Sequence, residues 1–152
     1  MAKMMVSTLV VKDDAVLMVR ENRIQYAGLW NLPAGHVEEL LDEDIADAAV
    51  RETRSESGYD VRLTDFMTVV DTIVEGRRAL VFVYIAELIS EEQGEYDTEE
   101  INAVAFVPIG DFEGETAIGL RLPAAYLRFP KEIQEVLRLW KAGERPPIVR
   151  IR

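Results

Sequence analysis

Two glutamates, Glu52 and Glu56, stand four positions apart in a stretch whose apolar residues recur at helical spacing. Residues four apart lie on one face of an α-helix, so both carboxylates should project from the same side. Like charges at this spacing slightly destabilise an isolated helix, and a bound divalent cation would remove that cost. Acidic residues four apart are more often solvated surface charge, so the pair by itself is only a weak indication of a metal site.

The helix that must carry these glutamates is predicted from its apolar face and its end signals. The mostly apolar face consists of Ile45, Ala48, Ala49 and Thr53. Asp42 can cap the start of this helix, where the helix dipole also favours acidic residues. Gly58 can adopt the left-handed conformation that ends a helix. We therefore expect a loop, a helix and a tight turn between residues 35 and 59.

The wider spacing in this stretch resembles a known signature. Its fixed positions are Gly35, Glu43, Arg51, Glu52, Glu56, Gly58 and Tyr59. This pattern, over residues 35–59, resembles the Nudix box of the Nudix hydrolases, and residues 28–38 resemble the usual lead-in to that box. The resemblance extends over nearly the whole chain, so we expect one Nudix domain over residues 1–152. The lead-in and residues 120–123 and 141–146 resemble most the phosphatase-type branch of the family.

Three features depart from the family's pattern. The segment from Gly35 to Glu43 is two residues longer than the family's, and extra residues fit more easily in a loop than in a helix. Thr53 stands where an aliphatic residue is usual. Ser55 replaces the first glutamate of the family's Glu-Glu pair, which is commonly a metal ligand. A hydroxyl there can ligate weakly or hold a metal-bound water.

The resemblance implies hydrolysis of a pyrophosphate linkage with Mg²⁺, for which Mn²⁺ can substitute. Glu52 and Glu56 would hold the metal, and the carbonyl oxygen of Gly35 would be a further ligand. The family often supplies one more carboxylate from the loop before a late strand. Glu100, with Glu99 as its rival, stands at about that offset. It would either ligate the metal or act as a base that aligns water.

The resemblance implies a different role for Arg51. In the family this arginine pairs with the glutamate matched here by Glu43, which holds the loop to the helix and supports Glu52 and Glu56. The one histidine, His36, is expected to be structural or peripheral, because the family's chemistry rests on glutamates and metal. The residues expected to support the site are Glu43, Ser55 and Gly58.

Three arginines and a tryptophan outside the box are candidates for substrate binding. Arg20, Arg23 and Trp30 lie before the box, in a region that often binds substrate in this family. An aromatic residue there is more often a core plug or a lid. Arg77, together with Arg78, stands at an expected turn and could clamp a phosphate. Solvated turn charges are the more frequent case.

Composition narrows the class of protein. A chain of 152 residues with 49% hydrophobic residues can bury a core as one domain. A net charge of −11 argues against nonspecific nucleic-acid binding. The absence of cysteine excludes disulfides and suits a reducing compartment such as the cytoplasm. The chain shows neither a signal peptide nor an apolar run of membrane-spanning length.

The remaining elements predict an α/β fold. Apolar, β-rich runs are expected to form strands at residues 4–11, 15–19, 66–74, 79–88 and 103–107, with turns at 12–14 and 75–78. We expect a turn or short helix at 108–112 and a loop at 114–123. A last helix should begin at Pro130, with an apolar stripe at Ile133, Val136, Leu137 and Trp140. This order does not alternate as in a parallel α/β fold. It predicts a mixed sheet between helices, in agreement with the α/β/α sandwich that the resemblance implies.

Three hypotheses about function follow. The first is magnesium-dependent hydrolysis of a nucleoside di- or triphosphate, a nucleoside diphosphate linked to another group, or a small pyrophosphate. The second is a Nudix-fold nucleotide-binding or regulatory module, weakened as an enzyme by Ser55 and the longer loop. The third, an acidic interaction domain, would leave the spacing of the box unexplained. The tail at Pro146 and Pro147 either lies along the body or contacts a second subunit, so a homodimer is one alternative.

Overall fold

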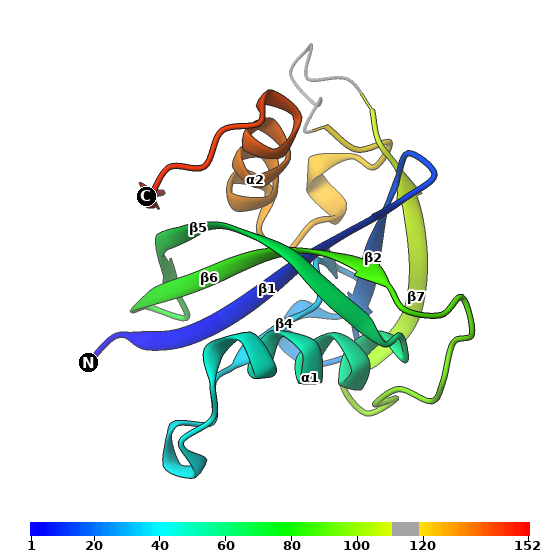
Figure 1. Cartoon of the computed structure of the whole chain (residues 1–152), viewed down its shortest axis with the longest axis horizontal. Coiled ribbons are helices and arrows are strands. Elements are labelled where there is room, and N and C mark those ends of the chain that lie inside the picture. The colour runs from blue at the N-terminus through cyan, green and yellow to red at the C-terminus, as the bar shows by residue number, and fades with distance from the viewer. Residues whose placement is uncertain (111–118) are drawn as a thin grey trace.

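The computed structural model describes residues 1–110 and 119–152, and its elements form a mixed β-sheet with a helix on each side (Figure 1). The strands are β1 Lys3–Lys12, β2 Ala15–Glu21, β3 Trp30–Asn31, β4 Ala34–His36, β5 Val61–Val74, β6 Arg77–Leu88, β7 Ile101–Pro108 and β8 Ile148–Arg150. The helices are α1 Ile45–Ser57 and α2 Pro130–Ala142, with 3-10 turns at Ile24–Tyr26, Glu39–Leu41 and Ala124–Tyr126. Among the described helices, none is long and apolar enough to cross a membrane.

The sheet combines parallel and antiparallel pairs. Its strand order is β3-β2-β1-β6-β5-β8, with β4 also paired to β1 and β7 to β2. β1 runs parallel to β6, and β5 runs parallel to β8. The other neighbours are antiparallel. The prediction of a central mixed sheet is therefore confirmed.

Two short turns connect the long strands. Residues 13–14 have φ values of 49° and 58°, and residues 75–76 have φ values of 51° and 75°. Two successive left-handed residues make a turn whose twist matches that of the flanking strands, which explains these tight hairpins. The second turn is shorter than predicted, because Arg77 and Arg78 already belong to β6.

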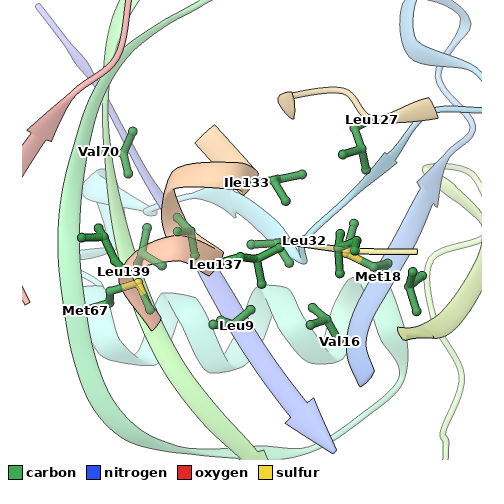
Figure 2. Packing of buried hydrophobic residues seen from close by; sticks show 14 residues of the cluster. Leu9, Val16, Met18, Leu32, Met67, Val70, Leu127, Ile133, Leu137 and Leu139 are labelled. Carbon is green, nitrogen blue, oxygen red and sulfur yellow. The ribbon is translucent and has the colours of Figure 1, made fainter. Parts of the chain in front are cut away.

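The two faces of the sheet bury different clusters. α1 packs Ala48 and Ala49 against Val6, which points to one face of β1. Leu9 points to the other face, where α2 completes a larger cluster (Figure 2). This cluster includes Met18, Met67, Val70, Ile133, Val136, Leu137 and Leu139. The sheet between two helices is the α/β/α sandwich that was expected.

Several predicted boundaries were wrong. α1 has Asp44 as its N-cap, and Asp42 lies in the preceding loop with a φ of 53°. The tail contains a strand that was not predicted: β8 pairs with β5, and the Val69 N–H donates to the Pro147 carbonyl at 3.4 Å. It therefore lies along the body.

Of the turn predicted at 108–112, Pro108 ends β7 and Ile109 forms an isolated bridge with Leu120, and residues 111–112 lie outside the described residues. Of the loop predicted at 114–123, residues 114–118 lie outside them, and residues 119–123 form no helix and no strand beyond that bridge.

Candidate active site

A cleft of about 240 Å³ opens beside α1, β4 and the end of β2. Its charged lining is mostly acidic. The lining carboxylates are those of Glu21, Glu38, Glu52, Glu56, Glu75 and Glu100, and the lining arginines are Arg23 and Arg128. Such a cleft has enough negative charge to attract a cation.

Glu52 lies against Gly35 on the floor of this cleft. The side chain of Glu52 is only 16% exposed. A Cβ atom added to Gly35 would lie 2.2 Å from Cδ of Glu52, so only glycine leaves room for the carboxylate. Burial raises the pKa of Glu52, and the negative charges of Glu100 and Glu38 add to this effect.

Glu56 lies one turn further along α1 and is buried, with 5% of its surface exposed. Its Oε1 accepts a hydrogen bond from the Ala34 N–H at 2.8 Å. Burial raises the pKa of Glu56 well above its usual value, and Glu21, Glu52 and Glu100 raise it further. The charged form is therefore costly, and a bound cation would stabilise it.

Arg51 ties the loop before α1 to the helix and to β4. Its Nε and Nη2 donate to the two carboxylate oxygens of Glu43, at 2.7 and 2.9 Å. Nη2 also donates to the His36 carbonyl at 3.0 Å, and Nη1 donates to Glu52 Oε1 at 2.7 Å. The Glu43 contact lowers the pKa of Glu43 and raises that of Arg51. The longer loop is accommodated before Glu43 by the 3-10 turn Glu39–Leu41.

Glu100 lines the cleft, whereas its rival Glu99 is exposed and is not among the lining residues. The Asn22 N–H donates to the Glu100 carbonyl at 2.8 Å, which joins this loop to the end of β2. Ser55 is exposed and does not line the cleft. Its carbonyl accepts a hydrogen bond from the Asp97 N–H at 2.8 Å. The structure therefore brings Glu100, but not Ser55, together with the two helix glutamates.

Gly58 ends α1 in the left-handed conformation, with a φ of 80°. Its N–H donates to the Arg54 carbonyl at 2.8 Å. A Cβ atom at Gly58 would lie 2.2 Å from the Gly94 carbonyl oxygen. Both the conformation and the close approach require glycine here.

Of the four candidates for substrate binding, Arg23 lines the cleft and the other three do not. The Arg20 guanidinium lies 5.6 Å from the ring of Trp30, and its Nε donates to Asn102 Oδ1 at 2.6 Å. Arg77 is exposed and donates to the Met1 carbonyl at 3.2 Å.

Four charged residues of the cleft were missed in the sequence, namely Glu21, Glu38, Glu75 and Arg128. Arg128 Nη1 donates to Glu21 Oε1 at 3.0 Å, and the two side chains are 6% and 3% exposed. One signal was available for Glu21, because an acid at the end of a strand that is otherwise largely apolar needs a partner. Arg128 stands 107 positions away, and no local pattern marks it.

The donor set fits a hard divalent cation. Carboxylate oxygens are the ligands that Mg²⁺ prefers, and burial together with mutual repulsion raises the pKa values of Glu52 and Glu56. Within residues 1–110 and 119–152, no three acidic, histidine or cysteine side chains are gathered closely enough to hold a metal as they stand. Metal binding would therefore require side-chain rearrangement.

A second, mainly apolar hollow adjoins the cleft between the sheet and α2. The two share Met5, Asn31, Ala34, Val74 and Phe129. Asn31 Oδ1 accepts a hydrogen bond from the Leu32 N–H at 2.9 Å, which fixes its amide group. Glu132 also lines this hollow, and burial raises its pKa.

The chain is similar to known proteins over most of its length. Phosphatase NudJ of Escherichia coli strain K12 is 27% identical over 140 residues, which are 91% of this chain and 84% of NudJ. The 8-oxo-dGDP phosphatase NUDT18 of Danio rerio is 38% identical over 74 residues, which are 49% of this chain but only 21% of that protein.

The fold and the family agree with these relatives. A solved NUDIX hydrolase from Nitrosomonas europaea shares the fold, with a TM-score of 0.79, 24% identity, and coverage of 97% of this chain and 93% of that one. The NUDIX domain family matches residues 2–126. Because this match covers most of the chain and the cleft lies within it, the protein belongs to the NUDIX domain family and is a Nudix hydrolase.

Proposed function

We propose that this protein hydrolyses a pyrophosphate linkage in a nucleotide with the help of Mg²⁺ or Mn²⁺. The observation that carries the proposal is the set of carboxylates from Glu52, Glu56 and Glu100 that meet in one cleft. The substrate would be a nucleoside di- or triphosphate, a nucleoside diphosphate linked to another group, or a small pyrophosphate. NudJ and NUDT18, both named as phosphatases, support this class. We expect the protein to act in the cytoplasm.

The residues that would hold the cation are Glu52 and Glu56, together with the carbonyl oxygen of Gly35. A bound cation of this kind neutralises phosphate oxygens and lowers the pKa of a water molecule. A carboxylate that the cation does not engage accepts the proton of the attacking water. We assign this role to Glu100, because it lines the cleft from the loop before β7 and not from α1.

Other residues position the reacting groups. Arg51 fixes the Glu52 carboxylate through the contact at 2.7 Å, and Glu43 in turn fixes Arg51. Gly35 leaves the space that this carboxylate fills. Arg23 supplies positive charge near the phosphates. The apolar hollow would take the part of the substrate attached to the diphosphate, with the Asn31 amide beside it.

One observation favours a second candidate function. Ser55 stands where the family usually has a glutamate, so the box has one carboxylate fewer than the family's usual set. A site that binds metal more weakly would serve as a regulatory nucleotide-binding module and hydrolyse the nucleotide only slowly. The retained Arg51, Glu52 and Glu56 favour an enzyme.

The experiment that separates these functions is a turnover assay over a broad panel. Phosphate and pyrophosphate release is measured with nucleoside triphosphates, diphosphates, diphosphate sugars, dinucleotides and thiamine-pathway pyrophosphates, with and without Mg²⁺. We expect metal-dependent turnover of at least one class, and its loss in Glu56→Gln. No turnover across the panel, with nucleotide binding retained in calorimetry, would contradict the enzyme and favour the binding module.

A further inference from the structure

In the part of the chain that the structure describes, three buried side-chain nitrogen or oxygen atoms without hydrogen-bond partners belong to residues that line the same cleft as the helix glutamates. They are Oε2 of Glu21, Nε of Arg23 and Nε of Arg128, and all three residues line the cleft. A buried donor or acceptor without a partner is unfavourable, so three in one place point to a ligand that satisfies them.

Arg128 is held in a rigid position. Its guanidinium Cζ lies 3.7 Å from the centre of the Tyr26 ring and 4.7 Å from that of Phe129. Glu21 accepts a hydrogen bond from its Nη1 at 3.0 Å, and Glu75 lies 3.5 Å from its Nη2. The guanidinium is therefore oriented before any ligand arrives, while its Nε–H remains without an acceptor.

Glu21 and Arg23 lie beside Arg128 because of an irregularity in the sheet. The pairing of β2 with β7 shifts register between Arg20 and Glu21, and such bulges change the direction of a side chain. Nη2 of Arg23 lies 3.7 Å from Oε2 of Glu21, too far for a hydrogen bond. Both Arg23 Nε–H and Glu21 Oε2 therefore remain available to a ligand.

Two unpaired guanidinium donors and one unpaired carboxylate acceptor define the ligand chemistry. Guanidinium groups bind phosphate oxygens with charge-assisted hydrogen bonds. A terminal phosphoryl group has a second pKa near 6, so it can carry a hydroxyl as well as anionic oxygens. Its hydroxyl could donate to Glu21 Oε2, and its oxygens could accept from the two arginines. A diphosphate capped by a sugar or a second nucleoside has no such hydroxyl.

We infer that Glu21, Arg23 and Arg128 form a subsite for the uncapped terminal phosphoryl group of the substrate. The assignment of this group as part of the hydrolysed molecule rests on the proposed function. A subsite of this kind narrows the substrate class to nucleoside di- or triphosphates and small pyrophosphates that have an uncapped terminal phosphoryl group. Arg23 and Arg128 contact the phosphoryl group, and Glu21 both accepts from it and orients Arg128.

The first test compares two substrates that differ only in the cap, a nucleoside diphosphate and the same nucleoside diphosphate joined to a sugar. Arg128→Lys and Arg128→Gln should raise KM for the uncapped substrate roughly tenfold to hundredfold, the range expected for a lost charge-assisted hydrogen bond. KM for the capped substrate should change little. An equal effect on both substrates, or an effect on neither, would overturn the inference.

Two further variants control for folding. Arg128→Gln leaves Glu21 buried without its partner, so the double variant Glu21→Gln with Arg128→Gln removes both charges together. It should show the same selective rise in KM. Arg138→Gln removes an exposed arginine that is paired with Glu135 on α2, and it should behave as the wild type.

The second test does not depend on turnover. The Nε–H resonances of the arginines are followed by NMR in the Mg²⁺-loaded protein as inorganic phosphate is added. Those of Arg23 and Arg128 should shift saturably, whereas that of Arg138 should not. Saturable shifts in a protein that hydrolyses no substrate would support the phosphoryl subsite and contradict the proposed enzymatic function. Substrate turnover without these shifts would support the proposed enzymatic function and contradict the phosphoryl subsite.

Discussion

Asp71 and Glu56 are both buried carboxylates, but their surroundings are opposite. Asp71 accepts two hydrogen bonds from Arg78, at 3.0 and 2.8 Å, and one from Arg152 at 3.0 Å. Glu56 accepts one backbone hydrogen bond, from Ala34, and faces other glutamates. The arginines lower the pKa of Asp71, whereas burial and like charges raise the pKa of Glu56.

This difference separates a structural carboxylate from a functional one. The partners of Asp71 come from β6 and from the chain end after β8, so its ion pairs join the C-terminal segment to the sheet. Glu56 has no such arginine partner and faces Glu21, Glu52 and Glu100, so its charged form is unfavourable in the folded protein. Buried carboxylates that lower stability in this way are typical of binding and catalytic sites.

The largest expected effect is that of Glu56→Gln, which should lower kcat roughly a hundredfold to ten-thousandfold. The same change should raise the melting temperature at neutral pH without divalent metal. The folded pKa of Glu56 is raised, so the wild type loses stability as the pH rises from its unfolded value of about 4.3 towards the folded pKa. Thermal unfolding of both proteins from pH 4 to 8 measures the difference between their melting temperatures. Normal rates of Glu56→Gln at limiting Mg²⁺ would contradict the metal-ligand assignment.

Gly35→Ala should be next in size, with a loss in kcat of about a hundredfold. The φ of Gly35 is not in the left-handed region, so alanine fits the backbone. The new Cβ would instead displace the Glu52 carboxylate, which lies 2.2 Å from that position. Circular dichroism should show a folded protein. Wild-type kcat in this variant would show that the position of Glu52 does not matter.

Arg51→Ala should lower activity roughly tenfold to hundredfold, as removal of supporting partners at metal sites usually does. It should also lower the melting temperature, because Glu43 and Glu52 lose their partner. Arg54→Ala is the matched control on the same helix, since Arg54 and its partner Asp60 are largely exposed. If the two variants behave alike, the contacts of Arg51 have no special role.

Asp71→Asn should have the smallest effect on activity and a clear effect on stability. At pH 7 its melting temperature should be lower than that of the wild type. The pKa of Asp71 is lowered in the folded state, so its stabilisation is present above about pH 4 and is lost as the pH falls further. The two melting temperatures should therefore converge in acid. If the difference between the two melting temperatures does not change with pH, the ion pairs of Asp71 contribute little to stability.

The parts of the site that could be predicted are those set by local spacing. The face shared by Glu52 and Glu56 follows from helical periodicity, whereas the contact of Arg51 with Glu43 was predicted from the resemblance to the Nudix box. The pair of Glu21 and Arg128 was missed because its members are 107 positions apart and meet only through the fold. Arg77 was predicted as a phosphate contact from its residue type and its turn-like surroundings. In the structure it does not line the cleft and donates to the Met1 carbonyl instead.

The long strands were predicted because branched apolar runs and turn residues mark them locally. β8 was missed because Pro146 and Pro147 precede it, and a three-residue edge strand has no periodic pattern of its own. The N-cap at Asp44 was misplaced because several acidic residues precede α1, and each is an acceptable cap by type.

Calorimetric titration with Mg²⁺ and Mn²⁺ is the most direct test of the central claim that the carboxylates of the cleft bind a divalent cation. The titration compares the wild type, Glu56→Gln and Asp71→Asn. We predict saturable binding to the wild type and to Asp71→Asn, and a loss of most of that affinity in Glu56→Gln. Equal binding to all three proteins, or no saturable binding to the wild type, would contradict the claim.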